Sequence, residues 1–233
     1  MKRIVTIIAC LGLLLLGAGA AMAASVTASY GIGNTDAPNL EQFLFNKYID
    51  HVTETFDVDH DNLSAGATLS STGFMRLNVG PMIGSGGYVA DGSTAKLGEF
   101  AVTGDRFFSN GVDGAEGTSG FHVAFDANRE HRAVGFYLSG FDTNSMYTVT
   151  FGMRDGTSYT VDLAAYVAEL VDIGLPIYFG FETDGSFDGM FFHKSPDNFG
   201  LDNLSTMTTP IPGAVWLLGT GLFGLLGYRR LRG

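Results

Sequence analysis

The middle of the chain alternates between large apolar side chains and small or polar ones at every second position. Six segments show this alternation and are rich in aromatic and β-branched residues: Phe121–Asp126, Ala133–Leu138, Tyr147–Phe151, Tyr159–Leu163, Ile177–Phe181 and Phe187–His193. A period of two indicates strands with one buried face. Asp155-Gly156 lies between two of these segments and is a strong hairpin signal. The sequence therefore predicts an all-β fold, an antiparallel β-sandwich, rather than an alternating α/β fold.

Two segments depart from this pattern. Leu40, Phe43, Leu44 and Tyr48 follow helical spacing, which predicts a helix over residues 38–48 with Asn39 as its N-cap. Residues 163–171 fit either a short helix or the end of a strand. Residues 111–120 are glycine-rich and predict a long loop.

The N-terminus, residues 1–23, has the layout of a secretory signal peptide. A positive start is followed by an apolar run from Ile4 to Leu16, and Ala21 and Ala23 form an A-x-A cleavage site. The run is short for a membrane span, which needs about 20 residues. We therefore expect an N-terminal signal helix that is removed after Ala23. The only cysteine, Cys10, leaves with it, so the exported chain has no disulfide.

The C-terminus, residues 210–233, combines a proline motif, an apolar segment and a basic end. Residues 214–228 carry no charge and would span roughly 22 Å as a helix, which is short for a hydrocarbon core of about 30 Å. Arg229, Arg230 and Arg232 follow at once and favour a cytoplasmic end. These features predict a short C-terminal transmembrane helix that holds the chain in the membrane.

This three-part ending resembles the PEP-CTERM sorting signal of Gram-negative bacteria. Pro210, Ile211 and Pro212 stand where that family usually has Pro-Glu-Pro, so Ile211 departs from the pattern. The resemblance covers about 25 residues. It implies recognition and cleavage by an exosortase, a membrane-embedded processing enzyme, and a final location at the cell surface or in the extracellular matrix. Members of the family are typically surface or exopolysaccharide-associated proteins.

Between the two ends, residues 24–209 form one exported domain that is strongly acidic. It holds eight basic and all 24 acidic residues, for a net charge of −16. Nucleic-acid binding requires clustered Lys and Arg, so a nucleic-acid partner is excluded. The charge keeps an exported protein soluble and repels anionic polymers unless divalent cations bridge them. Calcium fits such a chain because it takes carboxylate and carbonyl oxygens.

A second, looser resemblance concerns the end of this domain. Phe199-Gly-Leu-Asp-Asn-Leu204, together with Thr55-Phe56-Asp57, resembles the last and an early strand of jelly-roll sandwiches found in PEP-CTERM proteins. The resemblance implies a jelly-roll-like β-sandwich in which those two strands share a structural cation. Asp57 and Asp202 hold the matching places, with Asp59 and Asn203 as further oxygen donors.

The residues themselves also point to calcium near Asp57. Asp57, Asp59 and Asp61 alternate, so on a strand they would share one face and repel one another unless a cation lies among them. Asn62 replaces the glycine that an EF-hand loop requires, which excludes that motif. The alternative is a strand that ends in a polar turn.

Catalytic motifs are weak throughout. The pairs Asp57/Asp59 and Glu182/Asp184 are the best candidates for the two carboxylates of a glycosidase, and no Gly-x-Ser-x-Gly elbow is present. Four tyrosines could stack on sugar rings if exposed, and are otherwise core residues: Tyr30, Tyr88, Tyr137 and Tyr178. The sequence thus favours a non-enzymatic cell-surface or exopolysaccharide-matrix protein. The alternatives are a calcium-assisted carbohydrate-binding module that binds extracellular polysaccharide, and a glycoside hydrolase.

Overall fold

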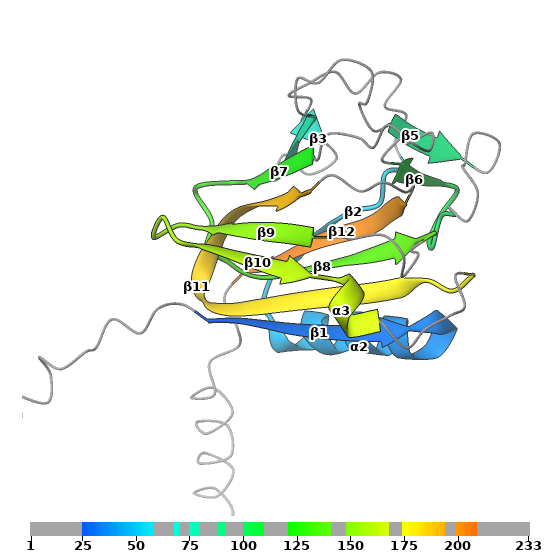
Figure 1. Ribbon diagram of the computed structural model, residues 1–233, viewed down its shortest axis with the longest axis horizontal. Helices are drawn as coiled ribbons and strands as arrows, with labels where there is room; N and C mark the ends of the chain where they lie inside the picture. The colour runs from blue at the N-terminus through cyan, green and yellow to red at the C-terminus, as the bar shows by residue number, and fades with distance from the viewer. Residues whose placement is uncertain are drawn as a thin grey trace, which may run out of the picture.

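The computed structural model of the protein describes residues 25–57, 68–69, 75–79, 88–91, 100–109, 121–140, 148–167, 174–193 and 199–208. The signal peptide with Ala21 and Ala23, the loop 111–120, Asp59, and the whole sorting signal lie outside the described residues. Within the described part, the chain is mostly antiparallel strand (Figure 1). The same part contains no helix that is long and apolar enough to cross a membrane.

Strand β11 (Ile177–Phe192) is the longest element and joins the two layers of one continuous antiparallel sheet. Its first half pairs with β1 (Val26–Ile32) on one side and with β8 (His131–Ser139) on the other. Its second half, beyond a register shift between Phe187 and Gly189, pairs with β9 (Thr148–Met153) and β7 (Phe121–Phe125). The two segments that the sequence predicts as separate strands are therefore one strand that turns from one layer into the next.

We call the layer built on the first half of β11 sheet A and the layer built on its second half sheet B. Sheet A has the order β1-β11-β8-β12-β6-β5, and β2 also pairs with β12; the new strands are β12 (Gly200–Thr208), β6 (Arg106–Ser109), β5 (Tyr88–Asp91) and β2 (His51–Glu54). Sheet B has the order β10-β9-β11-β7-β4-β3, with β10 (Ser158–Asp162), β4 (Met75–Val79) and β3 (Thr68–Leu69). All pairs are antiparallel.

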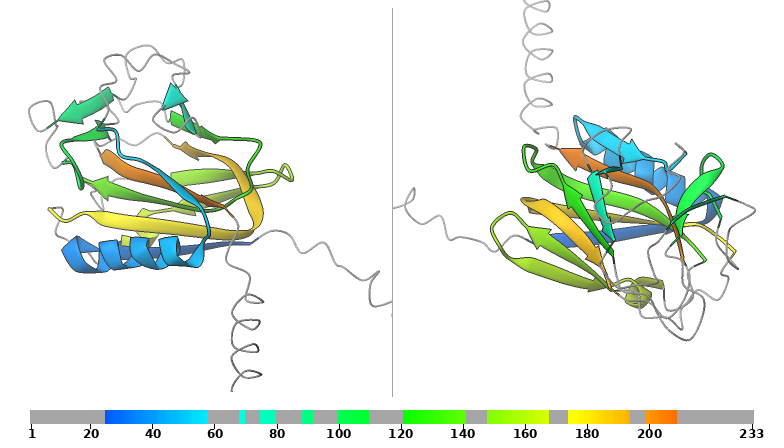
Figure 2. Two further views of the ribbon diagram at one scale, coloured as in Figure 1. Left: turned by 180° about the vertical axis from the view of Figure 1, so that it is seen from behind. Right: turned by 90° about the horizontal axis from the view of Figure 1, so that it is seen from above.

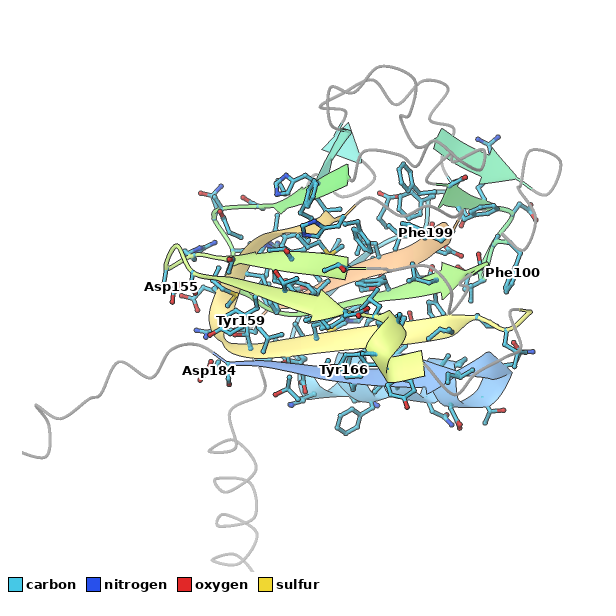
Figure 3. The ribbon with its side chains drawn as sticks, in the orientation of Figure 1. Phe100, Asp155, Tyr159, Tyr166, Asp184 and Phe199 are labelled. Carbon is cyan, nitrogen blue, oxygen red and sulfur yellow. The ribbon has the colours of Figure 1, made fainter. Side chains whose placement is uncertain are left out.

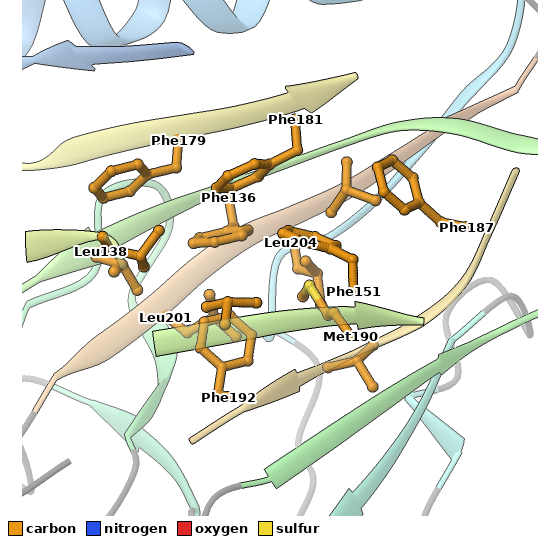
Figure 4. Packing of buried hydrophobic residues seen from close by; sticks show 14 of the residues in the cluster. Phe136, Leu138, Phe151, Phe179, Phe181, Phe187, Met190, Phe192, Leu201 and Leu204 are labelled. Carbon is orange, nitrogen blue, oxygen red and sulfur yellow. The ribbon is translucent and has the colours of Figure 1, made fainter. Parts of the chain in front are cut away.

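The main core lies between the two sheets (Figure 4). Phe136 and Phe181 of sheet A meet Phe192 and Phe151 of sheet B, with ring centroids 5.2 Å apart for Phe136–Phe192 and 4.6 Å apart for Phe151–Phe181. These rings come from alternate positions of their strands, as a period of two requires. The predicted antiparallel β-sandwich is confirmed.

The hairpin predicted at Asp155-Gly156 is also present, between β9 and β10. Gly156 has a φ of +86°, a conformation that glycine adopts without a steric penalty. Asp155 Oδ1 accepts the N–H of Thr157 at 2.9 Å and the hydroxyl of Thr157 at 2.6 Å. The turn is thus held by its own side chain.

Helix α2 (Gly33–Lys47) covers the outer face of sheet A, on the side away from β9 and β10 (Figure 2). Ala37, Leu44 and Tyr48 pack there against Tyr137 and Tyr178, which form a second, smaller core. The helix begins at Gly33 rather than near Pro38, so Asn39 lies inside it and Ile32 is the N-cap. Burial of Gly33 and Ala37 accompanies the earlier start. Helix α3 (Ala164–Val167) is one turn that follows β10.

Candidate functional site

Asp202, one of the predicted cation ligands, is almost fully buried, with 1% of its surface exposed. Its Oδ2 accepts the N–H groups of Val102 at 2.8 Å and Thr103 at 2.9 Å. Its Oδ1 accepts the N–H of Asn203 at 2.7 Å. The carboxylate therefore ties residues 102–103 to strand β12.

Asp57 lies close enough to Asp202 for its negative charge to act on it. Burial is the largest cause that raises the pKa of Asp202, to about 6, and the charge of Asp57 raises it further, while the three backbone N–H groups lower it. Asp57 Oδ1 accepts the N–H of Asp105 at 3.2 Å, so it binds the same segment of chain. The structure thus brings Asp57 and Asp202 together around residues 102–105.

Asn203 completes this cluster at an irregular point of β12. It has a φ of 45°, and the pairing with β8 shifts register between Asp202 and Ser205. Its Oδ1 accepts the hydroxyl of Thr103 at 2.7 Å, and its side chain also hydrogen-bonds Glu41 on α2. This irregularity directs the Asn203 amide toward both Thr103 and Glu41 of α2.

These contacts bear on how well a cation would fit. Both oxygens of Asp202 and the amide oxygen of Asn203 already accept hydrogen bonds, which stabilise a buried carboxylate without a metal. Within the described residues, no group of three or more His, Cys, Asp or Glu side chains is placed to hold a metal ion. Asp59 lies outside that part of the chain. Calcium at Asp57 and Asp202 stays a prediction.

Two of the four candidate tyrosines are core residues. Tyr137 and Tyr178 are buried beneath α2, with their rings 4.8 Å apart and edge to face. Tyr137 donates its hydroxyl to Glu41 Oε2 at 3.0 Å, whereas the buried hydroxyl of Tyr178 has no partner within the described residues. Burial raises the pKa of both phenols, and it raises that of Glu41. Neither ring is available to a ligand.

The carboxylate pair Glu182/Asp184 is divided between separate structural contacts. Glu182 binds Lys47 Nζ at 2.6 Å and accepts the hydroxyl of Tyr48 at 2.9 Å. Asp184 Oδ1 accepts the N–H of Ser25 at 2.8 Å, where the chain enters β1. Both side chains hold other elements to β11, which is a structural use of each carboxylate.

A groove lies at one edge of the sandwich, between the strands β1 and β10 and the helix α3. Both strands are edge strands, because within the described residues β1 pairs only with β11 and β10 pairs only with β9. The groove has a volume of about 500 Å³ and is lined by Val26, residues 159–162, Ala165 and Tyr166. A volume of this size is typical of small-molecule sites.

Two tyrosines, Tyr159 and Tyr166, line the groove, and both are labelled in Figure 3. Tyr166 is 38% exposed and contacts Tyr30, which is 44% exposed, edge to face at 6.0 Å. Tyr30 in turn packs on the core residue Phe179, and Tyr159 packs on the same core from β10. The rings of Tyr30 and Tyr159 therefore rest on the core, and the ring of Tyr166 rests on Tyr30. Within the described residues their hydroxyls have no hydrogen-bond partner.

Polar residues line the groove, and their hydrogen bonds also hold the elements around it in place. Asp162 Oδ1 accepts the N–H of Ala164 at 3.0 Å, which fixes the start of α3 and with it Tyr166. Thr160 Oγ1 lies 2.8 Å from Thr150 Oγ1. Flat rings beside hydroxyl and carboxylate groups can stack on an apolar ring face and hydrogen-bond its edge.

Sequence reasoning found Tyr30 but missed Tyr159 and Tyr166. Tyr159 follows the period of two like a core residue, and Tyr166 falls in the ambiguous segment 163–171. Only the tertiary fold places Tyr166 of α3 beside Tyr30 and Tyr159 of β10 in one groove with Val26 of β1. The side chain of Tyr88 lies outside the described ones.

No family model and no curated protein matches this chain. Among solved structures, the K2 cleaved adhesin domain of Lys-gingipain has a TM-score of 0.44 and 13% identity, covering 68% of this chain and 98% of its own. The C-terminal family 22 carbohydrate-binding module of Clostridium thermocellum Xyn10B has a TM-score of 0.34 and 13% identity, covering 70% and 95%. A xylan-binding domain of the same family has a TM-score of 0.35 and 12% identity, with the same coverage. At these TM-scores the likenesses assign neither a family nor a function to the chain.

Proposed function

We propose that this protein is an exported, non-enzymatic protein of the cell surface or exopolysaccharide matrix that binds carbohydrate in the groove between β1 and β10. The observation that supports the proposal is the set of three part-exposed tyrosines, Tyr30, Tyr159 and Tyr166, around a groove of about 500 Å³. The rings of Tyr30 and Tyr159 rest on the core, that of Tyr166 rests on Tyr30, and none of the three hydroxyls has a hydrogen-bond partner among the described residues. This combination leaves both the ring faces and the hydroxyls available to a ligand.

Sugars suit this groove because each pyranose has an apolar face and a polar edge. A tyrosine ring stacks on the face, and Thr160, Asp162 and the phenol hydroxyls can bond the edge. Fixed rings lose little conformational entropy on binding, which favours affinity. The groove is open at the surface, as a polymer ligand requires.

The groove supports binding rather than hydrolysis. A glycosidase needs two carboxyl groups about 5–9.5 Å apart on either side of the scissile bond. Asp162 is the only carboxylate among the described residues that line the groove, and it caps α3. We therefore propose a binding module without catalytic residues.

The two ends of the chain complete the proposal. Residues 1–23 direct export, and residues 210–233 hold the chain in the membrane until an exosortase-type enzyme processes it. The motif Pro210–Pro212 begins two residues after the end of β12 at Thr208. We also propose that the sandwich is of the jelly-roll class and that calcium binds at Asp57 and Asp202, with Asp59 and Asn203 as further donors.

The groove is tested by replacing Tyr166 with alanine. Affinity electrophoresis of the exported protein in gels that contain neutral polysaccharides should show retardation of the wild type and at least a tenfold loss of affinity for Tyr166→Ala, or about 1.4 kcal/mol. Phe43→Ala is the matched control, because Phe43 is an exposed aromatic residue (59%) on α2. Equal retardation of wild type and Tyr166→Ala would contradict the proposal.

The sorting signal is tested by removing it. Deleting residues 210–233 should abolish membrane retention and processing, because the apolar segment and the arginines hold the chain for cleavage. Cell fractionation with immunoblotting measures both effects. The same size and location for the full-length and truncated chains would contradict this part of the proposal.

A further inference from the structure

The two outer faces of the sandwich differ in what covers them. On sheet A, α2 packs over β1 and β11. On sheet B, no described helix or strand covers the outward-facing side chains, which are exposed or half-exposed: Ser158, Thr160 and Asp162 on β10, Thr148 and Thr150 on β9, Phe191 on β11, and His122 and Ala124 on β7. Their neighbours in sequence point into the core.

Strand register arranges this uncovered face in rows that cross the strands. One row is Thr160–Thr150–Phe191–His122, from β10 to β7. The adjacent row is Ser158–Gly152–Gly189–Ala124, which is made of small residues only. The face therefore has a row of small residues beside a row of hydroxyl, aromatic and imidazole groups.

Contacts between these side chains hold the row in place. Thr160 Oγ1 and Thr150 Oγ1 lie 2.8 Å apart, and Thr150 Oγ1 lies 2.7 Å from His193 Nε2. The ring of Phe191 meets the ring of His193 edge to face, with centroids 4.8 Å apart. At the far end His122 lies over Gly189, where a Cβ would come within 2.9 Å of Nε2. Such a row is preorganised for a ligand.

The uncovered face is continuous with the tyrosine groove. Thr160 and Asp162 line the groove, and both belong to the outward-facing residues of β10. A ligand that leaves the groove over the edge of β10 therefore meets Thr160 first, then Thr150 and His193. Neighbouring strands are about 4.8 Å apart, so the row from β10 to β11 extends the groove by about 10 Å.

We infer that a single neutral polysaccharide chain occupies both regions, running from the tyrosine groove across β10, β9 and β11 along the row Thr160–Thr150–Phe191. The inference rests on the proposed function and names its ligand class and path. The rows from β10 to β7 contain hydroxyl and imidazole groups, which both donate and accept hydrogen bonds, and Phe191 supplies an aromatic edge. Gly152 on β9 leaves the backbone open to close approach.

Charge selects a neutral chain over an acidic one. No Lys or Arg belongs to these rows between β10 and β7, whereas Asp162 and Asp188 are exposed carboxylates on the same strands. The protein as a whole has a net charge of −11. A uronate polymer would meet repulsion along this path without a cation that offsets it.

Oligosaccharides of different length test the outer face of sheet B and the groove separately. Isothermal titration of the exported protein with a neutral disaccharide and the matching hexasaccharide, from the cello-, manno- and xylo-series, compares the two regions. We expect the longer ligand to bind more tightly to the wild type. His193→Ala should weaken the hexasaccharide about threefold to tenfold and leave the disaccharide unchanged, since it removes about one hydrogen bond. Thr27→Val, an exposed threonine on β1, is the control.

The outcomes distinguish the inference from the proposed function. Equal hexasaccharide affinity for wild type and His193→Ala, with both ligands lost in Tyr166→Ala, would overturn the path across sheet B and leave the groove as the site. No binding of either ligand by the wild type would overturn the proposed function itself. Tighter binding of a hexauronate than of any neutral hexasaccharide would overturn the ligand class. Thermal melting shows that each variant is folded.

Discussion

The cluster around Asp202 and the groove around Tyr166 are both polar, yet they differ in where their hydrogen bonds go. Asp202, Asp57 and Asn203 meet donors of the same chain, all from residues 102–105 or from Asn203 itself. The hydroxyls of Tyr30, Tyr159 and Tyr166 meet none among the described residues. Buried polar groups that are satisfied internally stabilise a fold, whereas fixed but unsatisfied groups at the surface are ready for a ligand. The difference separates a structural cluster from a candidate binding site.

The largest effect should come from breaking the structural cluster. Asp202→Ala removes the acceptor of three backbone N–H groups, and we expect a loss of about 3 kcal/mol in the free energy of unfolding, since each buried donor costs about 1–3 kcal/mol and relief of the buried charge offsets part of this. Denaturant unfolding measures it. Asp105→Ala, at an exposed position in the same segment, should change stability by less than about 0.5 kcal/mol. Equal stability of Asp202→Ala and wild type would make the cluster irrelevant to folding.

Bound calcium would make the cluster around Asp202 a metal site in addition to a set of hydrogen bonds. If Asp57 and Asp202 bind the ion in the folded state only, saturating calcium at about 100 times its dissociation constant should add about 2.7 kcal/mol to stability. Differential scanning calorimetry with millimolar calcium and with chelator tests this, and Asp202→Asn should lose most of the shift. Identical melting curves with and without calcium would leave amide donors as the sole stabilisers of Asp202.

A pH titration of stability tests the structural role of Asp202 in a second way. The pKa of Asp202 is raised from 3.8 to about 6 in the folded protein, mainly by burial. Between these values the folded state binds a proton that the unfolded state releases, so stability from this group increases as the pH falls through 6 and is complete below 3.8. We expect a gain of the order of 2 kcal/mol for wild type relative to Asp202→Asn between pH 7 and 4.

The comparison with Asp202→Asn removes opposing contributions. Burial lowers the pKa of His122 and His131, and their protonation destabilises the fold on acidification. Both proteins share these histidines, so their effect cancels in the difference. A stability difference that does not vary with pH would show that Asp202 titrates in the folded state as it does in the unfolded chain.

The smallest expected effect is on carbohydrate affinity, and it tests whether ring stacking or hydrogen bonding dominates binding in the groove. Tyr30→Phe and Tyr166→Phe keep the ring and remove the hydroxyl, so carbohydrate affinity should fall only about threefold, compared with at least tenfold for Tyr166→Ala. Titration calorimetry measures the ratio. If the phenylalanine variants lose as much affinity as the alanine variant, hydrogen bonds rather than ring faces dominate binding.

Sequence periodicity predicted the sandwich well because strand side chains alternate between two faces. Phe136 and Leu138 were expected to share a face, and both lie in the core. Tyr137 between them belongs to the opposite face, and the sequence left open whether that face is exposed. A period of two does not say which outer face a helix covers. Burial of Tyr137 therefore depends on the packing of α2, a contact between distant segments.

The groove was beyond sequence reasoning for a similar reason. Tyr30 and Tyr166 are far apart in the chain, and they meet because β11 belongs to both sheets and brings their edge strands together. The approach of Asp57 and Asp202, by contrast, was expected from the resemblance to jelly-roll sandwiches. The structure places the two residues around one segment, while the ion itself stays a prediction.

The claim that the tyrosine groove binds carbohydrate is tested most directly by an NMR titration with a neutral oligosaccharide, following the ring resonances of the individual tyrosines. The account predicts that the signals of Tyr30, Tyr159 and Tyr166 shift with a common affinity and that those of Tyr137 and Tyr178, buried under α2, do not. Binding that leaves the three groove tyrosines unshifted would contradict it.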